Sequence, residues 1–463
     1  MKNLRFFSIF LVLVLLTGLF SSVAYAAPED DSFEQITVAA KAALLVDGDS
    51  GQVLLEQNAD AQLYPASITK CMTALLVLEA VNEGKLSLDQ VVTASQTAID
   101  MLTADSSTAG IKVGEQLTVE QLLYCVMVQS ANEACYILAE AVCGDIDTFV
   151  AKMNVRAQEL GCENTNYVNP CGLHDPQHYT SARDIYLVTK EAMKYSLFMT
   201  MAGTTKYVLP ATNMSKERIC RTTNYLLDQW RAVGYLYSPA KGIKTGHTSD
   251  AGYCLVSYAE KNDRSLIAIV LGAEAVKDEN GNTKIQSFSE SKRLLEWGFS
   301  DFHRTTILDK SELIEQIPVT LSRKTNYVVV HPAESVETLL PKNLSPEDLI
   351  REITLDDTSV KAPVTLDQKL GTITLKDSSG AVYVTTDLLA LNDVPASKIL
   401  VLLYHLELFF DHLIVKIAAV VLLVLLALAI ITLLRRRPRR YRGGQSYHTR
   451  RRQNRYQGRK RRR

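Results

Sequence analysis

Residues 65–84 read PASITKCMTALLVLEAVNEG, a largely apolar segment bounded by a proline and a glycine. Pro65 suits the first turn of a helix, and Gly84 is typical of the position just past a helix end. The segment therefore predicts a helix over 65–82. Because its interior is apolar on every side, we expect this helix to lie buried at the centre of a domain.

Two polar side chains, Ser67 and Lys70, stand near the start of this predicted helix. A spacing of three residues places both on one helical face, one turn apart. A serine hydroxyl is a weak nucleophile unless a base lies within hydrogen-bond reach, and desolvation among apolar neighbours disfavours the charged form of a lysine. The pair therefore indicates a nucleophile with its base, although an ordinary helical turn with a solvated lysine has the same spacing.

A second polar cluster, Ser130-Ala131-Asn132, lies between two apolar segments. A bend in the backbone there would aim both polar side chains into one pocket. Ser130 is suited to relay a proton to a leaving amine, and Asn132 to hydrogen-bond a substrate amide. A turn or a helix cap explains the same three residues when they are taken alone.

A third cluster, Lys244-Thr245-Gly246, leads into a predicted pair of strands. Lys244 is suited to hold a terminal carboxylate, assisted by the hydroxyl of Thr245. Gly246 would let a substrate approach the backbone closely. A solvated lysine on an edge strand is the alternative, so only the joint order of the three clusters is informative.

The three patterns, in this order, resemble the set carried by serine β-lactamases and penicillin-binding proteins. The likeness extends to GL at 172–173, HYTSARD at 178–184 and KTGHTSDAGY at 244–253. On these residues the chain resembles the low-molecular-mass penicillin-binding proteins, the D-alanyl-D-alanine carboxypeptidases. The likeness covers residues 38–300 closely, and the segment 305–397 is similar to the family's C-terminal stalk domain.

The resemblance implies acyl transfer from a peptidoglycan stem pentapeptide. Ser67 would attack the carbonyl of the penultimate D-alanine, Lys70 would accept the proton, and Ser130 would pass a proton to the departing D-alanine. Water would then hydrolyse the acyl-enzyme. β-Lactams mimic the D-Ala-D-Ala end, so the resemblance also implies that they acylate Ser67.

The resemblance further implies how the substrate is held. Lys244 and Thr245 would bind its terminal carboxylate, and the backbone N–H groups of Ser67 and His247 would form the oxyanion hole. The sequence departs from the family at Ala131, where glycine is frequent. The added methyl group is expected to narrow the pocket or alter the rate.

The pattern of the whole chain predicts an α+β catalytic domain followed by a small all-β domain. The resemblance implies a β-lactamase/transpeptidase-like antiparallel sheet with a helical block for the first. Its strands are expected at 42–47, 52–56, 252–259 and 265–272. Its helices are expected at 65–82, 118–143 (a pair), 147–160, 181–200 and 286–297. Alternating runs predict further strands at 316–321, 326–330, 350–355, 371–375 and 381–386.

Both ends of the chain carry targeting patterns. Residues 1–26 have basic residues, an apolar run and a small-residue site, as in a cleaved secretory signal peptide. Residues 413–434 are long and apolar enough for one transmembrane helix, and the basic tail 435–463 is then cytoplasmic by the positive-inside rule. The body is thus expected outside the cell, anchored in the cell membrane by its C-terminus. Residues 400–412 fit either an interfacial amphipathic helix or a continuation of the span.

The composition of the chain limits the partners and cofactors that we expect it to bind. All 51 acidic residues lie within 27–434, where 33 of the 50 basic residues accompany them. An acidic body argues against a nucleic-acid partner. The eight cysteines show no zinc-type spacing, and we expect neither a metal nor another cofactor. The cysteines fit either disulfides of an exported protein or buried free thiols.

Two other functions compete with the carboxypeptidase. A class A β-lactamase needs a Glu-x-x-x-Asn loop to place the deacylating water, and residues 163–166 read ENTN, which has the wrong spacing. A non-catalytic cell-wall binding module would not need the intact Ser67, Lys70, Ser130 and Lys244. The sequence therefore favours the carboxypeptidase over both.

Overall fold

The computed structural model describes residues 36–278 and 281–435. Contacts divide the chain into two units. The first holds the chain up to Asp309 together with Glu334–Glu352 and Thr374–Thr385, and the second holds the remaining segments. The predicted signal peptide and, beyond Arg435, the predicted basic tail lie outside the described residues.

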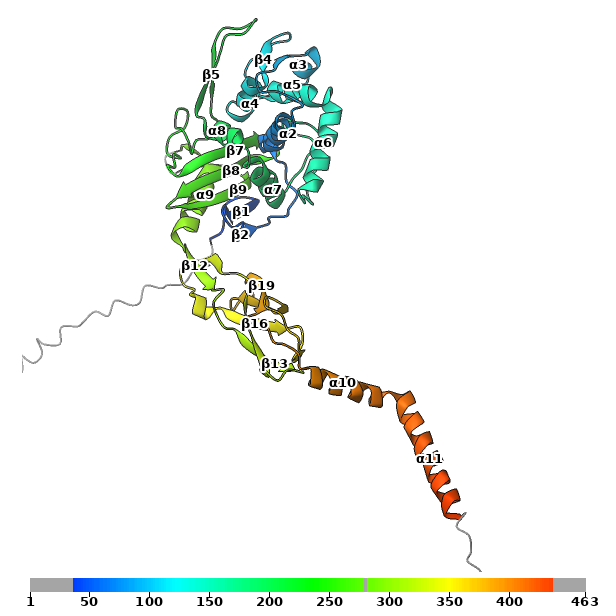
Figure 1. The fold of residues 1–463 in the computed structure, drawn as a ribbon. Coiled ribbons are helices and arrows are strands. Elements are labelled where there is room, and N and C mark those ends of the chain that lie inside the picture. The colour runs from blue at the N-terminus through cyan, green and yellow to red at the C-terminus, as the bar shows by residue number, and fades with distance from the viewer. Residues whose placement is uncertain (1–35, 279–280, 436–463) are drawn as a thin grey trace, which may run out of the picture. The chain divides into compact units, whose positions relative to one another are not determined.

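A five-stranded antiparallel sheet forms the framework of the first unit, with strand order β2-β1-β9-β8-β7 (Figure 1). Its strands are β1 (Ala42–Asp47), β2 (Val53–Gln57), β7 (Ala240–Thr248), β8 (Gly252–Lys261) and β9 (Arg264–Ala273). Both predicted strand pairs are confirmed. The Lys244 cluster itself forms β7, which lies at one edge of the sheet.

Helices cover both faces of this sheet because its side chains alternate between two cores. Leu44 and Ile269 pack with the helical block, whereas Leu45 and Val270 pack with α9. The helices are α2 (Lys70–Asn82), α3 (Gln96–Asp100), α4 (Val119–Met127), α5 (Asn132–Cys143), α6 (Ile146–Glu159), α7 (Ala182–Ala192), α8 (Ser196–Gly203) and α9 (Gln286–Ser300). The predicted central helix is confirmed, since almost every residue of α2 is buried.

Two local predictions need correction. Ser67 precedes α2, in a 3₁₀ turn, η1 (Ala66–Thr69), rather than standing on the α-helix itself. The helix predicted at 181–200 is two helices, because α7 ends at Ala192 and α8 begins at Ser196. No proline or glycine marks that break.

Three short ribbons were not predicted, because strands of three or four residues leave almost no alternation to detect. They pair β3 (Val91–Thr93) with β4 (Gln116–Thr118), β5 (Lys206–Leu209) with β6 (Arg218–Arg221), and β10 (Ala275–Lys277) with β11 (Thr283–Ile285). The β5–β6 hairpin matters below because Thr223, which follows β6, lines a cavity.

The predicted all-β segment is confirmed as strands. Each of its five predicted runs is a strand: β13 (Glu315–Thr320), β14 (Tyr327–Pro332), β16 (Ile350–Leu355), β18 (Lys369–Lys376) and β19 (Val382–Ala390). With β17 (Val360–Lys361) they form a sheet of order β16-β18-β19-β14-β13-β17. A separate ribbon pairs β12 (Phe302–Leu308) with β15 (Val336–Pro341), and η2 (Pro346–Asp348) is a short 3₁₀ turn.

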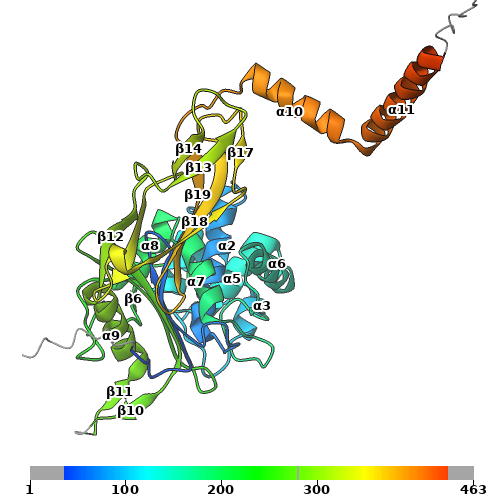
Figure 2. The same cartoon turned by 90° about the horizontal axis from the view of Figure 1, so that it is seen from below.

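Two helices end the described chain (Figure 2). Ser397 caps α10 (Lys398–Asp411), whose apolar side chains are largely exposed. His412 is extended, so α10 is a separate helix and not a continuation of the span. The last helix, α11 (Leu413–Arg435), is apolar and long enough to cross a bilayer.

Candidate active site

The turn that carries Ser67 is held in an uncommon backbone conformation. Ala66 has φ +48°, a left-handed value that costs an L-residue roughly 1 kcal/mol or more. Two glycines make room for the turn. A Cβ on Gly172 would overlap the carbonyl oxygen of Ala66, and one on Gly246 would lie 2.8 Å from the carbonyl oxygen of Pro65. The surrounding chain therefore fixes where the hydroxyl of Ser67 points.

Lys70 is fully buried, and three oxygens surround its amine. Its Nζ lies 2.8 Å from Ser67 Oγ, 2.8 Å from Asn132 Oδ1 and 2.6 Å from the carbonyl oxygen of Cys171. All three oxygens accept hydrogen bonds from this amine, so a basic nitrogen lies within hydrogen-bond reach of the Ser67 hydroxyl. The geometry thus suits proton transfer from Ser67 to Lys70.

Ser130 stands on the bend that its sequence context predicted. Its φ is +61°, and the bend ends α4 and starts α5. Lys244, only 1% exposed, donates from Nζ to Ser130 Oγ at 3.0 Å and to the carbonyl oxygen of Thr245 at 3.0 Å. Burial, and then the charge of Lys70, lower the pKa of Lys244 to about 7.

A cavity of about 220 Å³ opens between these groups. Thr245 faces it, with its hydroxyl 2.5 Å from that of Thr223, and the ring of His247 packs on Tyr253. The full lining comprises Ser67, Ser107, Ser130, Thr223, Tyr225, Thr245, Gly246, His247, Tyr253, Cys254, Ile285, Ser287 and Phe288. Three chain segments far apart in sequence thus place their predicted site residues around one opening.

Two predicted residues also make contacts within the protein that the sequence did not indicate. The side-chain oxygen of Asn132 accepts from Lys70, and Asn132 is not among the residues that line the cavity, so its contact with a substrate stays a prediction. Gly246 lines the cavity, as its predicted role requires, and a Cβ there would also meet Pro65, Ser67 and Ile68. Its lack of a side chain therefore lets β7 pack on η1, which brings the backbone at His247 close to that of Ser67.

Asn169 is a positioning residue that the sequence did not single out. Its Oδ1 accepts hydrogen bonds from the backbone N–H groups of Cys171, Gly172 and Leu173, which shapes the loop so that the Cys171 carbonyl reaches Lys70. The Gly172-Leu173 pair was a visible signal for this loop, but a lone asparagine upstream of it was not.

Glu133 is a second positioning residue that was missed. Its Oε1 accepts from the hydroxyl of Thr108 at 2.6 Å and from the backbone N–H groups of Ala109 and Ile111. The adjacent N–H of Asn132 donates to the carbonyl oxygen of Ser107 at 2.8 Å. Glu133 therefore fastens the loop that carries Ser107 to the bend at Ser130.

His178 belongs to the structural support of the site. Its Nδ1 accepts from the backbone N–H of Val168, so its Nε2 carries the proton and donates to the hydroxyl of Thr69 at 2.9 Å. Burial lowers its pKa to about 4. Within the described residues, no group of His, Cys, Asp and Glu side chains is arranged to hold a metal ion.

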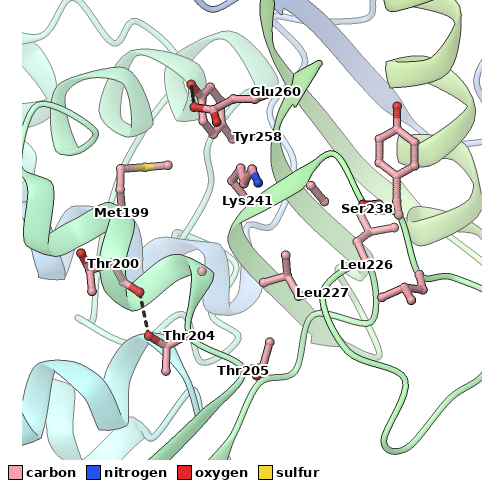
Figure 3. Close-up of a pocket in the computed structure, with 14 residues that line it drawn as sticks. Met199, Thr200, Thr204, Thr205, Leu226, Leu227, Ser238, Lys241, Tyr258 and Glu260 are labelled. Carbon is pink, nitrogen blue, oxygen red and sulfur yellow. Dashed lines mark hydrogen bonds between the residues drawn. The ribbon is translucent and has the colours of Figure 1, made fainter. Parts of the chain in front are cut away.

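A larger hollow, of about 570 Å³, lies near the other end of β7 (Figure 3). Lys241 projects into the middle of this view, and the hydroxyl of Tyr258 donates to Glu260 at 2.8 Å. Thr204 donates to the backbone of α8. None of the predicted site residues lines this hollow.

The fold, and the contact of Ser67 with the buried Lys70, are those expected of a serine hydrolase. Residues 28–275 match the D-alanyl-D-alanine carboxypeptidase family, and residues 302–396 match the C-terminal domain of penicillin-binding protein 5. The chain belongs to the D-alanyl-D-alanine carboxypeptidase family and is a serine-type carboxypeptidase.

Several named proteins are similar to this chain over most of its length. It is 32% identical over 364 residues to the D-alanyl-D-alanine carboxypeptidase DacF of Bacillus subtilis, covering 79% of this chain and 88% of that protein. It is 32% identical over 363 residues to DacC of Escherichia coli, covering 77% and 84%. The crystal structure of penicillin binding protein 5 from Haemophilus influenzae matches with a TM-score of 0.61 and 29% identity, over 78% of this chain and 99% of that one.

Proposed function

We propose that this protein removes the terminal D-alanine from peptidoglycan stem pentapeptides through an acyl-enzyme on Ser67, and that β-lactams inhibit it by acylating the same hydroxyl. The observation that carries the proposal is the buried contact of 2.8 Å between Lys70 Nζ and Ser67 Oγ. The names and functions of the relatives support the choice of substrate.

Acylation begins at the turn η1. Ser67 Oγ attacks the carbonyl carbon of the penultimate D-alanine while its proton passes to Lys70. The backbone N–H groups of Ser67 and His247 stabilise the oxyanion, an effect that is worth about 10²–10³ in rate for one donor in comparable enzymes. The close packing of Gly246 on η1 supports this pairing because it brings the two backbones together.

Collapse of the tetrahedral intermediate requires a proton on the departing amine. Ser130 lies between the site of attack and Lys244, which donates to its hydroxyl. Because the pKa of Lys244 is lowered to about 7, this lysine exchanges a proton readily near neutral pH. When charged, Lys244 also attracts the terminal carboxylate of the substrate, and Thr245 and Thr223 offer hydroxyl groups beside it.

Deacylation separates this proposal from the β-lactamase alternative. No aspartate or glutamate is among the described residues that line the cavity. A penicilloyl group on Ser67 therefore lacks a carboxylate to activate its attacking water, and we expect it to persist for many minutes. A rapid turnover of penicillin would favour the β-lactamase.

We further propose that α11 spans the cell membrane, with the catalytic domain outside and the basic tail in the cytoplasm. The length and hydropathy of α11 support a span. The exposed leucines and phenylalanines of α10, such as Phe409 and Phe410, suit the interfacial position that was one of the two interpretations of this segment.

The experiment measures D-alanine released from a diacylated pentapeptide, in parallel with covalent labelling by a fluorescent penicillin. Wild-type protein is expected to give both signals. Ser67→Ala is expected to lose both, because only a hydroxyl can form the ester. Labelling of Ser67→Ala at the wild-type level would refute the assignment, and labelling without release of D-alanine would support a non-catalytic binding module.

A further inference from the structure

Three residues that line the catalytic cavity take no part in the proposed reaction, namely Tyr225, Ile285 and Phe288. Tyr225 lies in the loop after β6, Ile285 ends β11, and Phe288 lies in the first turn of α9. The ring of Tyr225 lies 5.0 Å from that of Phe288, measured between centroids. These three side chains form one side of the cavity, which we call the apolar wall.

The apolar wall is held from behind. The ring of Tyr235 lies 5.2 Å from that of Phe288, and its hydroxyl accepts a hydrogen bond from the backbone N–H of Ile285 at 2.7 Å. Phe288 is only 4% exposed and belongs to the core between the sheet and α9. Tyr225 and Ile285 are half-buried, so part of their surface is open to a ligand. A surface fixed in this way binds without a large cost of ordering.

The loop after β6 places the apolar wall beside the proposed carboxylate site. Thr222 and Asn224 are buried, whereas Thr223 and Tyr225, which alternate with them, are half-buried and line the cavity. The backbone N–H of Asn224 donates to the hydroxyl of Thr222 at 3.1 Å, which holds this alternation in place. Thr223 and Tyr225 therefore face the cavity together, and the hydroxyl of Thr223 lies 2.5 Å from that of Thr245.

We propose that Tyr225, Ile285 and Phe288 form an apolar subsite for the side chain of the substrate's C-terminal residue, the residue that leaves. The subsite selects apolar side chains against polar ones of the same size. This inference rests on the proposed function, in which Thr223 and Thr245 lie beside the terminal carboxylate. The side chain of a C-terminal residue branches from the carbon that carries this carboxylate, so it lies next to the residues that adjoin Thr223.

The chemistry of the cavity determines which side chains the subsite accepts. No aspartate, glutamate, lysine or arginine is among the described residues that line the cavity. Burial lowers the pKa of His247 below its usual value, so this ring is uncharged at neutral pH. Each methylene group buried against the wall should raise kcat/KM about fourfold. A carboxamide in the same place would lose its water to lie against two rings and an isoleucine, which lowers kcat/KM.

The test uses the full-length chain in detergent micelles and three diacylated pentapeptides that differ only in their last residue. That residue is D-alanine, D-leucine or D-asparagine, and the last two have side chains of nearly equal size but opposite polarity. Liquid chromatography of the released residue gives kcat/KM for each peptide. We expect kcat/KM for the D-leucine peptide to exceed that for the D-asparagine peptide by about tenfold or more.

Four variants assign this selectivity to the apolar wall. Tyr225→Ala and Phe288→Ala are each expected to lower the ratio of the D-leucine to the D-asparagine value severalfold. Tyr225→Phe keeps the ring and should keep the ratio. Tyr258→Ala makes the same change as Tyr225→Ala in the larger hollow, and it should leave both the ratio and the release of D-alanine unchanged.

The outcomes separate the subsite from the reaction itself. If D-alanine is not released by the wild-type protein, the proposed function fails. If D-alanine is released, but the other two residues are released equally or not at all, only the subsite is refuted. An unchanged ratio in Tyr225→Ala would also overturn the subsite, and this half-buried position decides the matter should Phe288→Ala fail to fold.

Discussion

Strand β7 borders two hollows, one near each end, and the smaller one holds the candidate chemistry. The hollow at Lys241 measures about 570 Å³, and the cavity at Ser67 about 220 Å³. Lys241 is exposed, whereas Lys70 and Lys244 are 0% and 1% exposed. Burying two amines away from water costs folding free energy unless hydrogen bonds compensate for the lost solvation.

The two hollows therefore differ in the burial of their amines as well as in volume, and burial of titratable groups is the better indicator of a functional site. Around Lys241, the polar groups satisfy one another within their own elements, as Tyr258 does with Glu260. Around Lys70 and Lys244, polar groups from distant elements converge on the two amines. The following experiments test whether the two ends of β7 differ in function as they differ in burial.

The largest effect is expected for Lys70→Met, which removes the base and keeps much of the side-chain volume. The second-order rate of acylation by a fluorescent penicillin should fall by about 10³-fold, within the range for loss of a general base. Lys241→Met makes the same substitution in the larger hollow, near the other end of β7, and this control should label normally. Equal rates for the two variants would contradict the role of Lys70.

Gly246→Ala compared with Gly203→Ala tests the packing at the two ends. A Cβ on Gly246 would come within about 3 Å of three backbone atoms of Pro65, Ser67 and Ile68, whereas one on Gly203 would meet only the carbonyl oxygen of Lys241, at 3.1 Å. We expect the acylation rate to fall about 10²-fold for Gly246→Ala, because a misplacement near 1 Å has that cost. Gly203→Ala should change the acylation rate less than twofold. A large fall in the rate for this variant would contradict the claim that only packing at the Ser67 end of β7 controls acylation.

The pH dependence of stability should distinguish the two lysines of β7. The pKa of Lys244 is about 7 in the folded protein and about 10.4 when unfolded. Between these values the unfolded chain binds a proton that the folded chain does not, so Lys244 makes stability rise with pH from about 7 toward 10. Melting temperatures measured at pH 7 and pH 9 should show a smaller rise in Lys244→Met than in wild type, while Lys241→Met should match wild type.

The sequence predicted which candidate residues meet in one place better than it predicted their surroundings. Ser67, Lys70, Ser130 and Lys244 could be singled out because polar side chains of these types recur at short, ordered spacings. Their supports were not, because Asn169 and Glu133 act through backbone N–H groups of loops whose shapes no local pattern encodes. The packing of Gly246 on η1 could not be predicted for the same reason, because its close neighbours are residues nearly 180 positions earlier in the chain.

The secondary structure was also predicted unevenly, with long elements predicted better than short ones. Long elements with a clear period, such as α9 and the β8–β9 pair, were predicted nearly to their ends. The β5–β6 hairpin has only four residues in each strand, and its pairing depends on packing against α4 that a single sequence does not reveal. Short elements that owe their structure to tertiary contacts are therefore where prediction failed.

Glu133→Gln should have an intermediate effect, because it keeps the shape of the side chain and removes its charge. The three donors from the loop 108–111 would bind a weaker acceptor, and charge-assisted hydrogen bonds are roughly twice as strong as neutral ones. We expect acylation to slow by about tenfold through a looser Ser107 loop, with partial rescue in Glu133→Asp. An unchanged acylation rate together with a lower melting temperature would limit Glu133 to stability.

The smallest effect is expected at the larger hollow. Lys241→Ala and Tyr258→Phe remove its central cation and the hydroxyl that donates to Glu260. Neither group touches a residue that lines the catalytic cavity, and an exposed lysine contributes little to stability, so D-alanine release should stay within about twofold of wild type. The measurement is kcat and KM on the same diacylated pentapeptide that tests Ser67. If Lys241→Ala raised KM severalfold while kcat held, the larger hollow would bind part of the substrate, and the two ends of β7 would share one function.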